Sequence, residues 1–361
     1  MDAIVVGAGI VGLSAALELR RRSANVTVLE QFVPGHARGS SHGELRITRA
    51  TYTDALYAQL VAEANREDWA RLTRDAGEPL VDPWPGCFFG PQGGAIDAAL
   101  RAVREAEADV VPLQAREARA RFPMFRFDEN ELVLDDRTAG VVRAERTMRA
   151  LDRLCRARGV ALRQQARARS IDPARRRVEI DAGWIHADAL VIAPGPFAKK
   201  LLASLPLRAV PQSVAYYAID GGPALPVWAS FEAELHYGLP DVGAGAKVAR
   251  HATAGQTDPD YLFEAEEAEL GRVDAFVRDR LVAWPKRIAA EACWYTMAPG
   301  EDFVMDLVAP GVAVGAGLSG HGFKLGPLVG RIVARLALDG ASGSPLFEAH
   351  RARFSATRPP D

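Results

Sequence analysis

A glycine-rich turn near the N-terminus constrains this chain more than any other feature. The apolar run Ala3 to Val6 is short and β-branched, which is typical of a buried parallel strand, and it ends at a G-x-G-x-x-G pattern. Gly7 permits a tight turn, Gly9 lets a pyrophosphate approach the backbone, and Gly12 lets the next helix pack closely on the strand. The N-terminus of that helix would direct its free N–H groups at the anion. The sequence therefore predicts a βαβ unit that holds a dinucleotide.

A second predicted strand, Val26 to Leu29, closes this unit on Glu30. An acidic side chain about 20 residues beyond the glycines can accept hydrogen bonds from both ribose hydroxyls of an adenosine, and it disfavours a 2′-phosphate. The glycine pattern alone is often only a turn, but strand, helix and acid together make a specific signal. They serve FAD and NAD equally well, so both cofactors remain open at this point.

Composition excludes several classes of function. The 361 residues can bury a large core and suggest two domains, or one cofactor domain with a second woven into it. The net charge of −2 gives no field to attract nucleic acid or a membrane surface, and no apolar run is long enough to span a bilayer. We find no signal-peptide pattern, and the scattered histidines and cysteines predict no metal site. The sparse cysteines, Cys87, Cys155 and Cys293, favour a reducing, cytoplasmic location.

The order of predicted elements indicates an α/β chain, α+β overall, with a Rossmann-like cofactor domain interrupted by an antiparallel-sheet substrate domain. Helices are predicted over 54–76, 96–108, 115–121 and 146–158. An apolar strand over 189–193 returns to the cofactor sheet, whereas 211–281 reads as aromatic strands and turns, with a further turn expected at Asp135 and Asp136. We expect the cofactor domain to comprise 1–80, 140–208 and 290–361, and the substrate domain to comprise 81–139 and 209–289.

Five ordered motifs give the chain a specific resemblance. They are GAGIVG at the N-terminus, GSSHGELRITRATY at 39–52, HYGLP at 236–240 with Lys247 beyond it, ACWYTMAPGEDFVMD at 292–306, and GLSGHGFKLGP at 317–327. Together they resemble the monomeric sarcosine oxidase family of flavoenzymes, within the larger D-amino-acid oxidase type. The resemblance implies FAD, bound through a cysteine sulfur, in a monomeric oxidase of secondary amino acids such as sarcosine, N-methyltryptophan and pipecolate. It also implies that the C–N bond is oxidised to an imine while O2 becomes hydrogen peroxide.

The resemblance also assigns roles to individual residues. It places the flavin-linking cysteine at Cys293, where cationic neighbours from the glycine loops are expected to lower the pKa of the thiol. Arg49 and Lys324 would bind the substrate carboxylate, the first as a bidentate fork and the second as a point charge. The remaining assignments are Lys247 over the flavin face for oxygen activation, His251 near the substrate amine, Tyr237 as an aromatic wall, and Ser41, His42, Arg46, Gly320, Gly322 and Lys324 around the cofactor. No separate strong base is evident.

Three side chains depart from the sarcosine enzymes or bear on the pocket. Leu45 stands where the sarcosine enzymes commonly have a threonine. The tryptophan at position 294, after the cysteine, is more similar to the pipecolate and piperideine-carboxylate oxidases of the family. Trp228 is expected in the pocket wall. Together they favour a larger or cyclic secondary amino acid over sarcosine, with an N-methyl amino acid demethylating oxidase as the alternative. The sequence also leaves open a flavin dehydrogenase that passes electrons to a partner, an NAD-dependent dehydrogenase, and a non-catalytic binding module.

Overall fold

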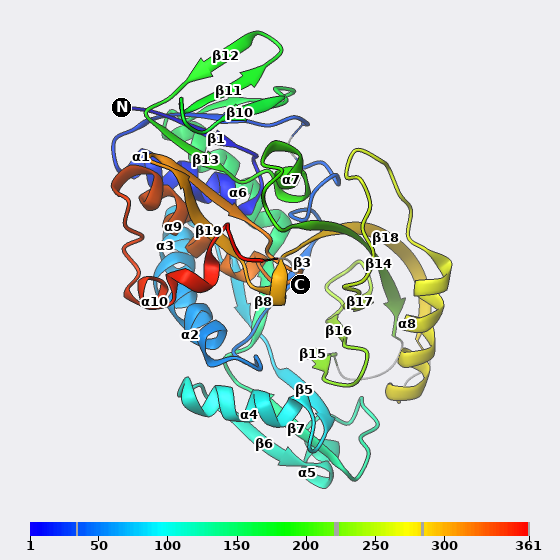
Figure 1. Ribbon diagram of the computed structural model, residues 1–361. Helices are drawn as coiled ribbons and strands as arrows, with labels where there is room; N and C mark the ends of the chain where they lie inside the picture. The colour runs from blue at the N-terminus through cyan, green and yellow to red at the C-terminus, as the bar shows by residue number, and fades with distance from the viewer. Residues whose placement is uncertain (34, 220–223, 283–284, 360–361) are drawn as a thin grey trace.

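The computed structural model describes residues 1–33, 35–219, 224–282 and 285–359 (Figure 1). Its first layer is a six-stranded sheet around the N-terminal strand. From one edge to the other the strands are β19 (Val304–Ala309), β20 (Val312–Ala316), β13 (Ala189–Ile192), β1 (Asp2–Val6), β2 (Asn25–Leu29) and β9 (Ala161–Arg163). All neighbours are parallel except β19 and β20. The predicted strand over 189–193 is confirmed, and it pairs directly with β1.

Both faces of this sheet are covered, which explains why its strands are apolar without alternation. Ala3 and Val5 face the helices α1 (Ile10–Arg21), α6 (Ala144–Ala157) and α9 (Gly326–Asp339), in one buried cluster. Ile4 and Val6 face a three-stranded sheet of β10 (Ser170–Asp172), β11 (Arg177–Ile180) and β12 (Gly183–His186). This small sheet caps the molecule at the top of Figure 1.

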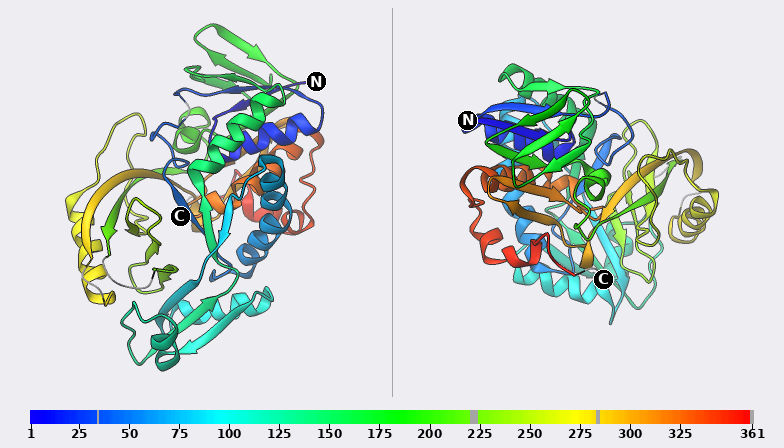
Figure 2. Two further views of the ribbon diagram at one scale, coloured as in Figure 1. Left: turned by 180° about the vertical axis from the view of Figure 1, so that it is seen from behind. Right: turned by 45° about the horizontal axis from the view of Figure 1, so that its top comes forward.

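The second layer is an eight-stranded sheet that lies beside the first (Figure 2). Its order is β18 (Lys286–Met297), β14 (Arg208–Ala218), β17 (Ala246–Arg250), β16 (His236–Leu239), β15 (Val227–Ser230), β5 (Gly86–Pro91), β7 (Glu131–Asp136) and β6 (Val110–Gln114). Only β15 and β5 pair in parallel among these strands as described. The expected mixed fold is therefore confirmed, with a largely antiparallel second sheet.

One helix in this layer was not predicted. The structure places α8 (Glu267–Arg280) in the stretch 211–281, where strands and turns were expected. Leu270, Val273 and Val277 recur at helical spacing and are buried, so the apolar period in this stretch is that of a helix. The turn expected at Asp135 and Asp136 lies later, because β7 continues through Asp136 and pairs with β5.

The predicted helix over 54–76 contains an irregular central turn. It consists of α2 (Ala55–Glu63), a π-helical segment η1 (Ala64–Trp69) and α3 (Ala70–Ala76). The other predicted helices are α4 (Ala95–Glu105), α5 (Ala115–Arg121) and α6. The remaining elements are β3 (Leu45–Thr48), β4 (Val81–Pro83) and β8 (Gly140–Arg143) in a small sheet, α7 (Ala198–Leu201), α10 (Pro345–Ala349), and the 3₁₀ turns η2 (Gly195–Phe197), η3 (Pro299–Glu301), η4 (Phe323–Leu325) and η5 (Arg351–Phe354). No helix in the described stretches of the chain is long and apolar enough to cross a membrane.

Candidate functional site

A cavity of about 1950 Å³ runs between the two large sheets. It begins at the glycine turn after β1 and reaches the strands β16, β17 and β18, and the segment before α9 also lines it. Ordinary ligand pockets hold about 300–1000 Å³, so this cavity has room for a large cofactor and a small substrate together. The cavity therefore brings the N-terminal motif and the C-terminal motifs to one site.

The three glycines of the turn after β1 lie where a side chain would clash with neighbouring atoms. A Cβ at Gly12 would lie 1.9 Å from the carbonyl oxygen of Gly7, and a Cβ at Gly7, where φ is +99°, would lie 2.4 Å from the carbonyl oxygen of Ala193. At Gly9 a Cβ would meet the Ser41 hydroxyl at 3.2 Å. That hydroxyl accepts the backbone N–H of Ile10 at 3.1 Å, so Ser41 caps the first helix. The backbone thus leaves a cradle that fits a pyrophosphate.

Glu30 lies buried at the rim of this cradle. Its carboxylate accepts the backbone N–H groups of Ala8 and Phe32, both at 2.9 Å, and His36 Nε2 lies 3.5 Å from it. Burial raises the pKa of Glu30, but the hydrogen bonds from His36 and from the two backbone groups outweigh it and leave the pKa lowered. Glu30 is therefore an ionised acceptor at the position expected for a ribose contact.

A second group of charges surrounds Lys247, whose side chain is buried, with the residue 7% exposed. Lys247 Nζ donates to Glu291 Oε1 at 3.1 Å, and the Tyr216 hydroxyl donates to the same oxygen at 2.6 Å. Burial lowers the pKa of Lys247, and nearby Arg46 lowers it further, while Glu291 acts in the opposite direction. Lys247 thus enters the cavity wall as the buried partner of an ion pair with Glu291, whose side chain is 29% exposed.

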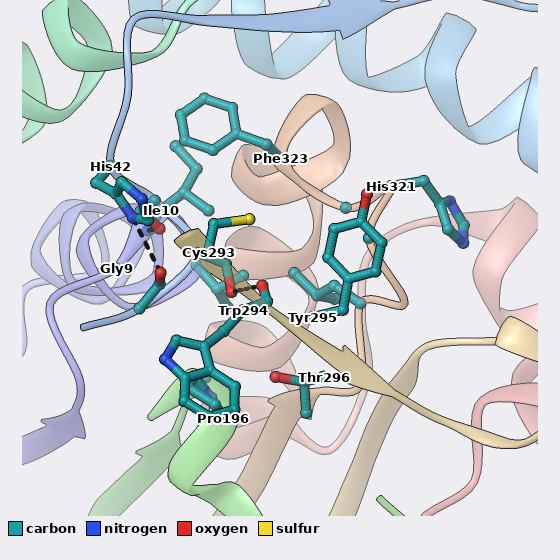
Figure 3. Close-up of a pocket in the computed structure, with 18 of the residues that line it drawn as sticks. Gly9, Ile10, His42, Pro196, Cys293, Trp294, Tyr295, Thr296, His321 and Phe323 are labelled. Atoms are coloured by element: carbon teal, nitrogen blue, oxygen red, sulfur yellow. Dashed lines mark hydrogen bonds between the residues drawn. The ribbon is translucent and has the colours of Figure 1, made fainter. Parts of the chain in front are cut away.

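Cys293 shares this environment because it lies two residues after Glu291 on β18. In Figure 3, Cys293 and Tyr295 lie on one side of the strand and Trp294 on the other. The expectation of a lowered thiol pKa is wrong. Burial raises the pKa of Cys293, and the opposing effect of Lys247 and Arg46 does not overcome it. The cationic neighbours moreover come from β17 and the 39–52 segment instead of the 317–327 loop.

The predicted flavin contacts His42 and Arg46 hold one another in place. The Arg46 guanidinium donates to the carbonyl oxygens of Leu45, at 2.8 Å, and of His42, and it lies 5.5 Å from the ring centroid of Phe323. His42 Nδ1 lies 3.0 Å from the Gly39 carbonyl oxygen. Burial lowers the pKa of His42, and Arg46 adds to this effect, whereas Glu291 opposes it.

The predicted carboxylate binders Arg49 and Lys324 meet around Tyr52. Lys324 is 5% exposed, and its Nζ donates to the Tyr52 hydroxyl at 3.0 Å and to the His321 carbonyl oxygen at 2.8 Å. The Arg49 guanidinium carbon lies 4.5 Å from the Tyr52 ring centroid, and Arg49 Nη1 is buried with no hydrogen-bond partner. Neither cation forms an ion pair with any residue in the described ranges. Burial, reinforced by Arg49, holds the pKa of Lys324 well below its usual range.

The wall beside these cations is aromatic. The hydroxyls of Tyr237 and Tyr295 lie 2.9 Å apart, and the imidazole of His251 lies 5.2 Å from the Tyr295 ring. His251 Nε2 is 3.3 Å from a carboxylate oxygen of Glu301. Gly320 makes room for this wall, because a Cβ there would lie 2.5 Å from the Tyr295 ring.

Gly322 likewise allows close packing in the same loop, since a Cβ would lie 2.3 Å from that of Leu318. The expectation that Trp228 lies in the pocket wall is wrong. Trp228 is fully buried away from the cavity, stacked 5.6 Å from Phe276 under α8, because the missing Cβ of Gly238 admits its indole. Trp294 reaches the cavity on the side of β18 opposite Tyr295 and contacts Phe263.

Four side chains were missed by sequence reasoning. Tyr52 and Trp69 support Lys324, the latter by donating Nε1–H to its carbonyl oxygen at 2.6 Å. Glu291 and Tyr216 support Lys247. Of these four, only Glu291 could have been found from the sequence. It lies two residues before Cys293, and residues two apart on a strand face the same side, so the acid would have been expected beside the cysteine.

Several known proteins are similar to this chain over nearly its whole length. A family model described as FAD dependent oxidoreductase matches residues 2–336. The chain is 31% identical to the peroxisomal sarcosine oxidase of Homo sapiens, over 93% of this chain and 92% of the relative, and 32% identical to the monomeric sarcosine oxidase of Streptomyces avermitilis, over 97% of each. It is 28% identical to the N-methyl-L-tryptophan oxidase of Yersinia pestis, over 98% of this chain and 99% of the relative.

The fold is shared with solved structures as well. The open form of NikD, an unusual amino acid oxidase essential for nikkomycin biosynthesis, superposes with a TM-score of 0.84 at 24% identity, covering 98% of this chain and 96% of NikD. L-proline dehydrogenase from P. horikoshii superposes with a TM-score of 0.81 at 19% identity, covering 99% and 97%. At these identities the likeness concerns the fold alone.

Proposed function

Because this chain belongs to the family of FAD-dependent oxidoreductases, we propose that it is an oxidase of secondary or cyclic amino acids. The substrate C–N bond loses two electrons and two hydrogens to become an imine, and O2 gains them to become hydrogen peroxide. The observation that carries this proposal is that two neighbouring cations in the cavity wall, Arg49 and Lys324, have no carboxylate partner among the described residues. Relatives named as oxidases of sarcosine and of N-methyl-L-tryptophan support it.

FAD fits the cavity because the glycine cradle leaves its backbone open and Glu30 supplies an ionised acceptor beside it. When bound, FAD supplies the two-electron chemistry. The residues proposed to hold its pyrophosphate end are Gly7, Gly9, Gly12 and Glu30, with Ser41 fixing the first helix. His42, Arg46, Gly320 and Gly322 are proposed to surround the rest of the cofactor, and Cys293 to link it covalently.

The chain's own role in the reaction is to bind and orient the substrate. We assign the substrate carboxylate to Arg49 and Lys324, since a buried cation without a partner gains most from an anionic ligand. Tyr237, with Tyr295, bounds the chamber, and His251 faces the substrate amine. Lys247 provides the fixed positive charge that favours electron transfer to O2.

Two classes of substrate fit the proposed oxidase, which are bulky or cyclic secondary amino acids and small N-methyl amino acids such as sarcosine. The argument for a bulky or cyclic amino acid used Leu45, Trp294 and Trp228. Leu45 and Trp294 line the cavity, whereas Trp228 is buried outside its lining. Steady-state kinetics with sarcosine, N-methylated aromatic amino acids, pipecolate and proline decide between them. The class with the highest kcat/KM identifies the substrate type.

The proposal is tested by denaturing the purified protein and measuring its intact mass. We expect a mass increased by one FAD, loss of that increase in Cys293→Ser, and peroxide formation with a secondary amino acid in air. Covalent flavin in Cys293→Ser would refute the attachment site. Substrate-dependent flavin bleaching without peroxide would instead favour a dehydrogenase.

Three further predictions belong to this proposal. A monomer is supported by the name of the bacterial relatives, monomeric sarcosine oxidase. A reducing, cytoplasmic location is supported by three unpaired cysteines, although the human relative is named peroxisomal. The division into a cofactor domain and a substrate domain is supported by the two separate large sheets, and limited proteolysis between β13 and β14 tests it. The boundary proposed at 289/290 falls inside β18, which pairs with β14 along its length.

A further inference from the structure

Lys247 is surrounded by five groups that titrate or carry charge. Arg46 and His42 approach from the 39–52 segment, Tyr216 from β14, and Glu291 and Cys293 from β18. Among the described residues, Glu291 is the only one that forms an ion pair with Lys247. The carboxylate of Glu291 is thus the negative charge beside the cations Lys247 and Arg46.

The strand register fixes this arrangement. β14 lies between β17 and β18, and its Tyr216 pairs with Lys247 on one side while its Val214 pairs with Glu291 on the other. The Tyr216 hydroxyl reaches the carboxylate oxygen that also accepts from Lys247, at 2.6 Å. Three strands therefore hold the acid, the tyrosine and the lysine together before any ligand is bound.

The energetics require such a partner. A buried ammonium is costly unless it is paired, and loss of the proton is the usual response of a lysine whose burial is not compensated. Arg46 adds repulsion. Burial also raises the pKa of Glu291, but Lys247, Tyr216 and His42 outweigh it and leave the pKa lowered, so its carboxylate stays ionised at neutral pH.

We propose that Glu291 is a positioning residue that keeps Lys247 protonated and fixes its ammonium in the cavity wall, with Tyr216 holding the carboxylate in place. The inference rests on the proposed function, in which Lys247 supplies a positive charge for the oxygen reaction. Glu291 itself does not touch the substrate in this scheme. It sets the pH range over which Lys247 carries its charge.

The test is a pH titration of the visible flavin spectrum of the resting holoenzyme, which reports the ionisation of nearby groups without turnover. In Glu291→Gln we expect a step that moves toward lower pH by about one unit or more relative to the wild type, since an opposite charge at this range shifts a pKa by about 1–3 units. The step should be absent in Lys247→Met and in the double variant. Tyr216→Phe should move it in the same direction by less.

Asp274→Asn is the matched control. Asp274 accepts from the hydroxyl of Tyr217, the next residue on β14, at 2.6 Å, so the variant removes the same charge from the outer side of the sheet. It should leave the spectral step in place. Reoxidation of reduced Glu291→Gln by O2 should be slow above its new midpoint and approach the wild-type rate below it.

A Glu291→Gln spectrum that titrates like the wild type would overturn the inference, and so would a shift that persists in the Lys247→Met background. The proposed oxygen reaction fails in a different way. If Lys247→Met is reoxidised as fast as the wild type while the step still depends on Glu291, the oxygen role of Lys247 is refuted and the ion pair stands.

Discussion

The two buried lysines of the cavity wall differ in what balances their charge. Lys247 has the carboxylate of Glu291 at 3.1 Å, whereas Lys324 has only the Tyr52 hydroxyl and a backbone carbonyl, with the Arg49 guanidinium nearby, among the residues that the structure describes. A charge that must persist without a ligand needs a protein partner, and a charge meant for a ligand needs the partner to be missing. Under the proposed function, the difference separates Lys247, whose charge the protein itself balances, from Arg49 and Lys324, whose charges a substrate carboxylate would balance.

The variant with the largest expected effect on this comparison of Lys247 with Lys324 is Arg49→Met. It removes the guanidinium proposed to bind the carboxylate bidentately, so the affinity for a simple carboxylate such as acetate or benzoate should fall about 100-fold, or ~3 kcal/mol. Perturbation of the flavin spectrum by the ligand measures the affinity. Lys247→Met is the control and should change this affinity by less than about threefold, because its charge is already balanced by Glu291. Equal losses in the two variants would contradict the comparison.

Carboxylate affinity should also depend on pH through Lys324. Burial and Arg49 lower the pKa of Lys324, so its ammonium is present below that lowered pKa and lost as pH rises through it. Affinity should therefore be highest at low pH and fall by up to about tenfold per pH unit above the midpoint. Lys324→Arg should flatten the profile because a guanidinium stays charged. A wild-type profile that is already flat would show that Lys324 does not titrate where the ligand binds.

Trp69→Phe tests how much the position of Lys324 matters, because it removes a hydrogen bond to the Lys324 backbone and leaves the ammonium unchanged. Trp69 donates to the Lys324 carbonyl from the π-helical segment η1, and such segments are frequent at functional sites. Loss of this bond should weaken carboxylate binding about three- to tenfold, the effect of one hydrogen bond. Trp84→Phe is the matched control, because Trp84, between β4 and β5, donates to the carbonyl oxygen of Leu225, just before β15, at 2.9 Å. It should leave the affinity unchanged, and an equal loss there would indicate a general loss of stability.

The features predictable from sequence were those with local patterns. The strand, turn and helix from Ala3 onward and the strand at Ala189 follow from residues that are neighbours in the chain, and the structure contains both. The motifs also named Arg49 and Lys324, which lie far apart in sequence and meet around Tyr52. Whether they bind a carboxylate stays a prediction.

What the sequence did not reveal depends on long-range register. Glu291 reaches Lys247 only because β14 lies between their strands, and nothing local states that order. The face to which Trp228 points depends likewise on its pairing with Gly238. The prediction of a lowered thiol pKa for Cys293 was wrong because burial raises this pKa by more than the neighbouring cations lower it. Burial is a property of the folded protein, which the local sequence does not state.

The smallest expected effect comes from Glu301→Gln. The contact of His251 with Glu301 resembles the ion pair of Lys247 with Glu291 in chemistry, but the Glu301 side chain is 47% exposed. Solvent screening limits such pairs to less than ~1 kcal/mol, so kcat/KM for a secondary amino acid should change by less than about fivefold at any pH. Measuring the pH profile of kcat/KM beside Glu291→Gln compares the two carboxylates directly. A loss in Glu301→Gln as large as that in Glu291→Gln would mean that substrate binding buries the contact of His251 with Glu301. Exposure in the free protein would then no longer separate the two contacts.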